Sequence, residues 1–311
     1  MSTMRAVRIH EFGSENVLRI ERVERPDPGK NEVLIKVMAA SLNPVDWKTR
    51  KGEFPVVSEE DLPMILGQDV AGEIVSTGDS VSGFGAGDRV FAILDNKHGG
   101  YGEYVAVPAS QIVPMPPSLS FDEAAAVPLA AMTAWQGLFI QGNLRSGQRV
   151  LIHAGSGGVG HFAIQFAKAK GAWVATTVSS ADSGLVKELG ADQIIDYQAE
   201  RFEEVLEPVD LVLDLIGGET QKRSLDVLKE GGVLVSTLEE PDKAASKRHK
   251  VRGVSYMVSQ NAKQLGEIAG LIDQGHVNVV LHKVFPFEQV AAAQRALEQE
   301  HVQGKIVLRV A

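Results

Sequence analysis

A glycine-rich loop between a predicted strand and a predicted helix constrains this 311-residue chain more than any other feature. The run Gly155-Ser156-Gly157-Gly158-Val159-Gly160 has the spacing G-x-G-x-x-G and follows the strand-like segment Val150–Ala154. The amphipathic stretch Val159–Lys170 and the next predicted strand complete a βαβ unit, the context that this spacing requires. Because free N–H groups at a helix start favour phosphate, we expect all six loop residues to contact a dinucleotide. The alternative is a glycine-rich turn that binds no ligand.

Strand-like and helical stretches alternate from residue 149 onward. The predicted strands are Arg149–Ala154, Trp173–Val178, Gln193–Tyr197, Asp210–Leu215, Val233–Thr237 and Arg252–Val258. The helices expected between them are Val159–Lys170, Gly184–Leu189, Arg201–Leu206 and Thr220–Lys229. This alternation predicts an α/β fold, a doubly wound six-stranded parallel sheet of the Rossmann type. The basic run 243–250 is expected to be a solvated loop.

The first third of the chain shows a different pattern, with short strand-like runs and no regular alternation with helices. Short β-branched runs at Met4–Ile9, Val33–Val37, Glu73–Ser76, Arg89–Ile93 and Tyr104–Val107 are separated by Gly, Pro and Asp, which predicts a barrel-like, mainly-β domain. Helices are expected at Phe121–Ala134, Ala262–Gln274 and Phe287–Glu300, and a last strand at 304–310. Because the tail does not continue the alternation, we expect it to complete the first domain. The expected boundaries are 1–122 for the first part of the catalytic domain, 123–258 for the nucleotide-binding domain and 259–311 for the returning segment.

Composition excludes several classes of protein. The chain has no cysteine, which rules out disulfides, a cysteine nucleophile and a cysteine-ligated zinc. Its formal net charge of −9 argues against a nucleic-acid partner, since nucleic-acid binders carry basic faces. The N-terminal residues lack the apolar core of a secretory signal, and no apolar run approaches the roughly 20 residues that span a bilayer. We therefore expect a soluble cytoplasmic protein with no membrane partner.

The end of the second Rossmann strand predicts NADP in preference to NAD. NAD sites usually carry an acidic residue there, which binds the ribose hydroxyls. This strand instead ends in the hydroxyl-rich run Thr176–Ser180, and Ser179, Ser180 and Tyr197 are candidate ligands of a 2′-phosphate. Asp182 comes a few residues late and is expected to begin the next helix. No Arg or Lys follows the strand directly.

Several motifs occur together along the chain. They are Gly67-Gln68-Asp69-Val70-Ala71-Gly72, Gly87-Asp88-Arg89-Val90, Gly102-Glu103-Tyr104, His153-Ala154 before the glycine loop, Leu189-Gly190-Ala191-Asp192 and Gly304-Lys305-Ile306-Val307. With them the chain resembles the medium-chain dehydrogenase/reductase superfamily over essentially its whole length. Within it, the chain is similar to the zinc-independent quinone oxidoreductase and enone (alkenal) reductase branch.

The resemblance implies a GroES-like catalytic domain around a Rossmann domain, an active site in the interdomain cleft, and a homodimer. Zinc-dependent members bind their catalytic zinc through Cys, His and Cys. The resemblance places Pro44 and Gln68 at the first two of these positions, and the chain has no cysteine for the rest. We therefore expect no zinc. Reduction of a conjugated carbonyl does not need such a metal, because hydride adds to a carbon that is already electrophilic.

The stretch Ser41-Leu42-Asn43-Pro44-Val45-Asp46-Trp47-Lys48 resembles the Asn-Pro-x-Asp-x-Lys segment of enone reductases. The resemblance implies that Asn43 contacts the nicotinamide or its ribose, and that Lys48 bonds the ribose or the substrate carbonyl. An ordinary surface lysine is the alternative for Lys48. Asp46 is expected to brace the loop rather than to transfer protons. Thr133 matches a cofactor-contacting threonine, with a hydroxyl bonded to its own helix as the alternative.

Further cofactor contacts are expected where the last three Rossmann strands end, because open α/β sheets bind ligands at the carboxyl ends of their strands. The candidates are Ile216, Gly217, Ser236, Leu238, Tyr256 and Met257. The function predicted is hydride transfer from NADPH, with NADH less favoured, to a small quinone or α,β-unsaturated carbonyl compound. The alternative is a nucleotide-binding sensor or interaction protein of the same fold without significant turnover.

Overall fold

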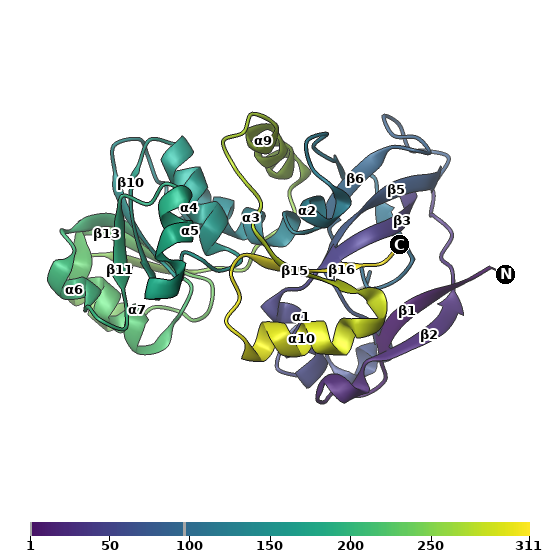
Figure 1. Cartoon of the computed structure of the whole chain (residues 1–311), viewed down its shortest axis with the longest axis horizontal. Helices are drawn as coiled ribbons and strands as arrows, with labels where there is room; N and C mark the ends of the chain where they lie inside the picture. The colour runs from purple at the N-terminus through teal and green to yellow at the C-terminus, as the bar shows by residue number, and fades with distance from the viewer. Residues whose placement is uncertain (1, 96–97) are drawn as a thin grey trace. The chain divides into compact units, whose positions relative to one another are not determined.

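The computed structural model describes residues 2–95 and 98–311, and these residues form two compact units (Figure 1). Unit 1 takes the chain up to Leu129 together with Gln260–Asp273 and Val279–Ala311, and unit 2 takes Ala130–Ser259 with Gln274–Asn278. Unit 1 is therefore discontinuous in sequence.

Unit 2 contains a six-stranded sheet in which every neighbouring pair is parallel. Its spatial order is β11-β10-β9-β12-β13-β14, so the chain starts in the middle and winds outward in both directions. The strands are β9 (Arg149–His153), β10 (Trp173–Val178), β11 (Gln193–Asp196), β12 (Val209–Asp214), β13 (Leu228–Ser236) and β14 (Arg252–Ser255). This confirms the predicted Rossmann sheet.

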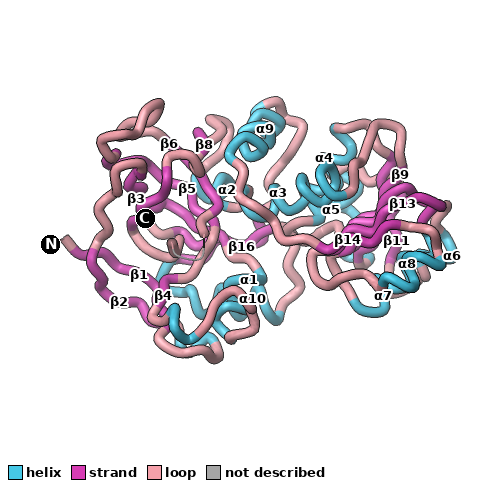
Figure 2. Tube along the Cα trace, turned by 180° about the vertical axis from the view of Figure 1, so that it is seen from behind, coloured by secondary structure: helices cyan, strands magenta, loops and turns pink. Residues whose placement is uncertain are grey.

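Helices cover both faces of this sheet, as right-handed crossovers in opposite directions require. In Figure 2, α4 and α5 lie on one side of the strands and α7 and α8 on the other. The bounds are α4 (Gly160–Ala169), α5 (Ser183–Glu188), α6 (Phe202–Val205), α7 (Gly218–Ser224) and α8 (Lys243–Arg248), with 3₁₀ turns at Ser180–Asp182 and Leu225–Val227 and a π-helical turn at Gln136–Gln141. The direction of winding reverses between β9 and β12, and the glycine loop follows the end of β9.

Two local predictions in unit 2 are wrong. The expected helix Thr220–Lys229 ends early, because Leu228 and Lys229 already belong to β13. The basic run 243–250 is not a loop, because it contains the helix α8. The carboxylate of Asp242 caps that helix by accepting from Ala245 N at 2.6 Å. Side chains of this run pair with acids nearby, as Lys250 does with Glu230 at 3.1 Å.

Unit 1 is built on two mainly antiparallel sheets. The larger has the order β15-β16-β3-β5-β6-β8, with β7 also paired to β3, and the smaller has the order β2-β1-β4. Their strands are β1 (Thr3–Ile9), β2 (Arg19–Glu24), β3 (Glu32–Ser41), β4 (Met64–Ile65), β5 (Asp69–Thr77), β6 (Arg89–Ile93), β7 (Tyr104–Pro108), β8 (Val113–Pro114), β15 (Leu281–Pro286) and β16 (Lys305–Arg309). The final strand β16 pairs antiparallel with β3, so the last strand of the chain belongs to the larger sheet of unit 1.

The helices beside these sheets differ in one respect from expectation. They are α1 (Pro44–Lys51), α2 (Phe121–Ala125), α9 (Ala262–Asp273) and α10 (Val290–Gln299), with 3₁₀ turns at Glu15–Val17, Glu59–Asp61 and Phe287–Gln289. Helix α3 (Pro128–Trp135) begins in unit 1 and lies mostly in unit 2. The single helix expected over Phe121–Ala134 is two helices. Pro128 lacks an N–H and its ring clashes with the preceding turn, so α2 ends before it, at Ala125, and α3 begins at Pro128.

Each unit has its own hydrophobic core. In unit 1, alternate residues of β3 such as Ile35 and Val37 pack with Ile74 of β5 and Phe287 before α10. In unit 2, Leu151, Ala175 and Val212 of adjacent strands pack with other apolar side chains. No helix among residues 2–95 and 98–311 is long and apolar enough to cross a membrane.

Candidate functional site

The glycine-rich loop joins β9 to α4, and sterics explain two of its glycines. A Cβ on Gly155 would lie 2.0 Å from Thr176 Oγ1 of β10, and a Cβ on Gly160 would lie 2.1 Å from the Ala154 carbonyl oxygen. The positive φ of the turn falls on Ala154 (φ 53°), not on a glycine. Gly155 is therefore needed for close packing on β10.

Ser156 is tied inside this loop. Its hydroxyl donates to Asp182 Oδ2 at 2.7 Å, and both side chains are buried. Asp182 ends the 3₁₀ turn before α5, so the contact joins the phosphate loop to the segment after β10. The prediction that Asp182 stands at a helix start agrees with this position. Its carboxylate also accepts a bond from the loop, which the sequence did not indicate.

The three candidate ligands of a 2′-phosphate lie at one edge of the sheet. Val178 of β10 pairs with Asp196 of β11, so the residues that follow, Ser179 and Tyr197, leave adjacent strands side by side. Tyr197 N donates to the Val178 carbonyl at 3.2 Å. Ser180 and Tyr197 are exposed and Ser179 is half-buried. The structure thus brings the three hydroxyl groups to the same end of two neighbouring strands.

Asp214, the last residue of β12, organises the next part of this edge. Its Oδ1 accepts from the backbone N–H groups of Ile216 at 3.0 Å and Gly217 at 2.9 Å. Its Oδ2 accepts from Gln221 Nε2 at 3.0 Å and from Ser236 Oγ at 2.9 Å. The carboxylate is fully buried, and four donors satisfy it. Asp214 therefore fixes the backbone after β12 and ties it to the end of β13.

Apolar side chains stand exposed where β12, β13 and β14 end. Ile216 is 51% exposed, Leu238 49% and Met257 60%, although large apolar groups are usually buried. Ser236 is buried and its hydroxyl donates to Asp214, so it supports this edge from the interior of the unit. Tyr256 OH donates to the carbonyl of Thr133, and burial raises the pKa of its phenol. Thr133 itself is 7% exposed.

His153 lies behind the glycine loop and is fully buried. Its Nδ1 and Nε2 each lie 2.9 Å from a hydroxyl oxygen, of Thr177 and Ser224 respectively. Burial lowers the pKa of this imidazole to about 4, so it is neutral at physiological pH. Neutral His153 acts as a hydrogen-bond bridge between β9, β10 and α7.

In unit 1, a buried cluster of charged groups surrounds the start of α1. Asn43 Nδ2 and Ser41 Oγ both donate to Asp69 Oδ2 at 2.7 Å, and Leu129 N donates to Asp69 Oδ1 at 2.8 Å. The ammonium of Lys305 donates to Asn43 Oδ1 at 2.5 Å and lies 3.8 Å from Asp69 Oδ2. Asn43 is only 2% exposed and both ends of its amide are bonded within the unit. Its side chain thus holds α1 against β5 and β16.

Asp46 occupies the first turn of α1 beside this cluster. Its Oδ2 accepts from Asn43 N at 2.7 Å and from Tyr101 OH at 2.8 Å. Burial, together with the nearby Asp69 carboxylate, raises the pKa of Asp46 to about 7, although the two hydrogen bonds and Lys305 oppose the shift. Bracing of the loop by Asp46 was predicted, and its bond to Asn43 N agrees with that role. Its titration near neutral pH was not predicted.

Lys48 lies two residues further along α1 and is half-buried. Its ammonium lies 5.7 Å from the centre of the Trp47 ring, a cation–π distance. It forms no ion pair with any described residue. Lys51 on the same helix lies 5.1 Å from the same ring but is also paired with Glu298. Of these two lysines, only Lys48 keeps its charge unpaired in the described part of the chain.

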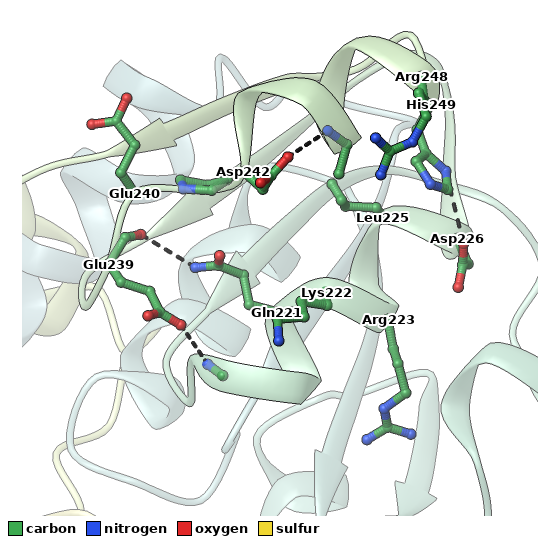
Figure 3. A pocket seen from close by; sticks show the side chains of 13 residues that line it. Gln221, Lys222, Arg223, Leu225, Asp226, Glu239, Glu240, Asp242, Arg248 and His249 are labelled. Carbon is green, nitrogen blue, oxygen red and sulfur yellow. Dashed lines mark hydrogen bonds and ion pairs between the residues drawn. The ribbon is translucent and has the colours of Figure 1, made fainter.

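A pocket of about 580 Å³ opens in unit 2 between α7 and α8 (Figure 3). Its polar groups are largely paired with one another. Glu239 Oε1 accepts from Gly218 N at 2.5 Å, Gln221 Nε2 donates to the Glu239 carbonyl at 3.2 Å, and His249 lies 3.7 Å from Asp226. Because both acidic and basic side chains line the pocket, it shows no charge preference for a ligand, and we assign no ligand to it.

Within the described residues there is no group of three or more His, Asp or Glu side chains that would hold a metal ion. Gln68 lies near the pair formed by His98 Nδ1 and Asp95 Oδ1, which are 2.6 Å apart, but these three do not make such a group. The residues present therefore do not fit a catalytic zinc site.

Three structurally central residues were not among the predicted site residues. Asp214 ends a strand in the run Asp214-Leu215-Ile216-Gly217-Gly218, and an acid directly before two glycines was the signal. Lys305 lies in the quoted motif Gly304-Lys305-Ile306-Val307, where a lysine inside an apolar strand indicates a buried partner. Tyr101 carried no signal, because its contact with Asp46 joins positions 55 residues apart.

Comparison with known proteins gives consistent relatives. Residues 29–117 match the family model described as alcohol dehydrogenase GroES-like domain, and residues 189–308 match the one described as zinc-binding dehydrogenase. The chain is 37% identical to the mitochondrial NAD(P)H oxidoreductase RTN4IP1 of Danio rerio, over 97% of this chain and 90% of that protein. It is 36% identical to the chloroplastic NADPH-dependent alkenal/one oxidoreductase of Arabidopsis thaliana, over 98% of this chain and 79% of that one.

A solved structure agrees with the whole fold. The quinone oxidoreductase from Coxiella burnetii superposes with a TM-score of 0.94 and 37% sequence identity, covering 100% of both chains. Its agreement extends over the GroES-like unit and the Rossmann unit together. The chain belongs to the medium-chain dehydrogenase/reductase superfamily, in its quinone oxidoreductase and enone reductase branch.

Proposed function

We propose that this protein is an NADPH-dependent reductase that transfers hydride to quinones or α,β-unsaturated carbonyl compounds without a zinc ion. The observation that carries the proposal is the carboxyl edge of the Rossmann sheet. There a tight glycine loop, three hydroxyl side chains and a row of exposed apolar side chains follow one another along adjacent strands. The names of the relatives in the preceding section, a quinone oxidoreductase and an NADPH-dependent alkenal/one oxidoreductase, support it.

The residues present fit a phosphorylated dinucleotide. The backbone of Gly157, Gly158 and Val159 and the first turn of α4 would hold the pyrophosphate, because N–H groups there are directed toward an anion. Ser179, Ser180 and Tyr197 would bind a 2′-phosphate, and Asp182 does not oppose it from the surface, since its carboxylate is buried against Ser156. When bound, NADPH supplies the hydride.

The apolar side chains of Ile216, Leu238 and Met257 would contact the nicotinamide and exclude water from it. The carboxylate of Asp214 fixes the backbone of Gly217 beside them. For Asn43 we propose a positioning role, because both ends of its side chain are bonded to Asp69 and Lys305. Lys48 would stabilise negative charge that develops on the substrate carbonyl oxygen, as a preorganised donor does. Thr133 and Tyr256 would hold the backbone near the ring.

We further propose that segments 1–122 and 259–311 form the catalytic domain and 123–258 the NADP-binding domain. The protein would be a cytoplasmic homodimer that acts on small molecules and binds neither nucleic acid nor membrane. Strand β14 lies at the edge of the six-stranded sheet, and an edge strand presents backbone groups to a partner strand. Sedimentation of the purified chain tests the dimer.

Activity is tested by following NADPH oxidation with a panel of quinones and enones. Turnover with at least one class is expected, whereas tight NADPH binding with no turnover on any would favour a nucleotide-binding sensor of the same fold. Titration should show tighter binding of NADPH than of NADH, and a tenfold preference for NADH would contradict the assigned 2′-phosphate site.

The matched pair Lys48→Met and Lys51→Met separates the two lysines that lie over Trp47. Lys48→Met is expected to slow turnover about a hundredfold, the lower end of the effect of one lost charge-stabilising donor. Lys51→Met should leave turnover within about twofold. Equal turnover of the two variants would reduce Lys48 to a surface residue.

A further inference from the structure

A small polar cavity in unit 1 adjoins the carboxyl group of Asp46. It leaves about 10 Å³ for the centre of a water molecule, close to the least volume that holds one. Among the groups that line it are Asp46, Thr49, Gln68, Asp95 and His98. The cavity therefore links a buried acid on α1 with a histidine–aspartate pair nearer the surface.

The hydrogen bonds of Asp46 leave one oxygen for this cavity. Asn43 N and Tyr101 OH both donate to Oδ2. Within the described residues no protein donor bonds Oδ1. When the acid is protonated, the proton thus belongs on Oδ1, and the cavity that Asp46 lines has room for a water that can accept it.

The charges around Asp46 keep this proton exchangeable. Tyr101 and the Asp69–Lys305 pair face it from inside the unit, and Asp95 and His98 face it across the cavity. Because burial and Asp69 together outweigh Lys305, the pKa of Asp46 lies at about 7, so the group gains and loses a proton near physiological pH. His98 Nδ1 is 2.6 Å from Asp95 Oδ1, and both side chains are partly exposed to solvent.

We propose that Asp46 is the proton store for the carbon-protonation step of enone reduction, refilled from solvent through the His98–Asp95 pair. The inference rests on the proposed function. Hydride adds to the β-carbon, and the carbon–carbon π pair moves onto the carbonyl to give an enolate. The enolate α-carbon then takes the proton of Asp46 through the cavity, and the Asp46 carboxylate recovers a proton from solvent. The sum is enone plus NADPH plus H⁺ giving saturated carbonyl plus NADP⁺.

Quinones provide the internal comparison. Hydride transfer to a quinone leaves a hydroquinone anion, which is protonated on oxygen, and water protonates oxygen anions readily. Protonation of an enolate on carbon is slower and needs a placed donor. A defect in the proton store should therefore affect enones far more than quinones.

The test is Asp46→Asn, which keeps the size and the acceptor oxygen but cannot ionise. We expect NADPH affinity within about twofold of wild type and enone kcat about a hundredfold lower, the lower end of the range for a lost general acid. Quinone kcat should fall by about threefold at most. The limb of the enone kcat profile near pH 7 should disappear, and in D₂O the α-carbon should be deuterated on both faces where wild type gives one. Asp79→Asn, an exposed carboxylate of the same unit, is the control and should change none of these.

An Asp46→Asn protein that retains enone kcat, its pH limb and single-face deuteration would overturn the proposal. If that variant does not fold, His98→Gln decides. It is expected to lower enone kcat about threefold and to raise the solvent isotope effect, and no change in either would equally overturn it. Failure of wild type to reduce any enone would instead refute the proposed function, and that result is visible before any variant is made.

Discussion

The two units bury polar groups in opposite ways. Unit 1 places several charges together beneath α1, with Asp69, Lys305 and the ionisable Asp46 inside one network. Unit 2 surrounds the carboxylate of Asp214 with neutral donors, and its buried imidazole, His153, is kept uncharged by burial and bonded by two hydroxyl groups. The first network depends on balance between charges, and the second on complete hydrogen bonding.

This difference matches what each unit is proposed to do. A network of opposed charges leaves one member, Asp46, close to its titration point, which suits proton exchange. A carboxylate with four donors has its acceptor sites occupied, which suits a rigid support for the nucleotide. The same fold thus separates a responsive site from a fixed one.

Removal of the cation should break the first network most severely. Lys305→Met leaves the buried Asp69 without its counter-charge and Asn43 Oδ1 without its donor. We expect about 3–5 kcal/mol lower free energy of unfolding, measured by urea denaturation of unit 1. Lys30→Met, at an exposed position of the same unit, is the control. The double variant Lys305→Met with Asp69→Asn should recover part of the loss, and a neutral effect of Lys305→Met alone would contradict a charge-balanced network.

The two buried titratable groups should give the units opposite pH dependence. The folded pKa of His153 is about 4 against 6.5 ordinarily, so the unfolded chain binds the proton first and unit 2 loses stability as pH falls from 6.5 toward 4. The folded pKa of Asp46 is about 7 against 3.8, so the folded state holds the proton longer and unit 1 loses stability as pH rises from 3.8 through 7.

At 1.36 kcal/mol per pKa unit, the total change in the free energy of unfolding is at most roughly 3 kcal/mol for His153 and roughly 4 kcal/mol for Asp46. Urea unfolding between pH 4.5 and 7.5 should show the difference between wild type and His153→Gln shrinking as pH falls. The difference between wild type and Asp46→Asn should shrink as pH rises. Slopes of the same sign for the two groups would refute the contrast between the units.

Loss of the central acceptor should test the second network. Asp214→Ala deprives two backbone N–H groups, Gln221 and Ser236 of their acceptor. We expect about 2–3 kcal/mol lower stability of unit 2, and NADPH affinity lower by about tenfold, since Ile216 and Gly217 lose their support. Asp226→Ala, an exposed acid in the turn after α7, should leave both values unchanged. Unaltered NADPH affinity in a folded Asp214→Ala protein would separate Asp214 from the nucleotide site.

The smallest effect is expected at the phosphate loop. Ser156→Ala removes one buried hydrogen bond to Asp182, worth about 1 kcal/mol. Thermal unfolding and NADPH titration measure the change, and Ser183→Ala is a matched control in the next turn. A loss as large as that of Asp214→Ala would mean that the loop, and not Asp214, is the main support of the nucleotide edge.

The sequence predicted the regular parts of the molecule because local patterns determine them. The strands Arg89–Ile93 and Trp173–Val178 have the predicted bounds, because β-branched runs flanked by Gly, Asp and Ser leave little choice. Strand β2 (Arg19–Glu24) was missed because four of its six residues are charged and none of them is buried. α8 was missed because a basic run without apolar period resembles a loop, although Asp242 caps it.

The candidate site was predictable only where a motif is contiguous. The glycine loop and the hydroxyl residues after β10 could be named because each lies within a few positions of a strand end. The partnership of Asp46 with Tyr101, and of Asn43 with Lys305, joins residues 55 and 262 positions apart and depends on tertiary packing. Only the structure shows that the side chains of Asn43 and Ser236 form hydrogen bonds within their own units.

The pairing of β16 with β3 has a consequence for the order of events during synthesis. Ala40 of β3 pairs with Leu308 of β16, so this pairing forms only after residue 308 has been made. Nearly all of unit 2, in contrast, lies in one continuous stretch of the chain. A ribosome therefore releases the complete nucleotide-binding sheet while the larger sheet of the other unit still lacks two strands. During that interval the end of β3, residues 39–41, presents an unpaired edge, so the emerging chain is most open to chaperones and to aggregation until β16 appears.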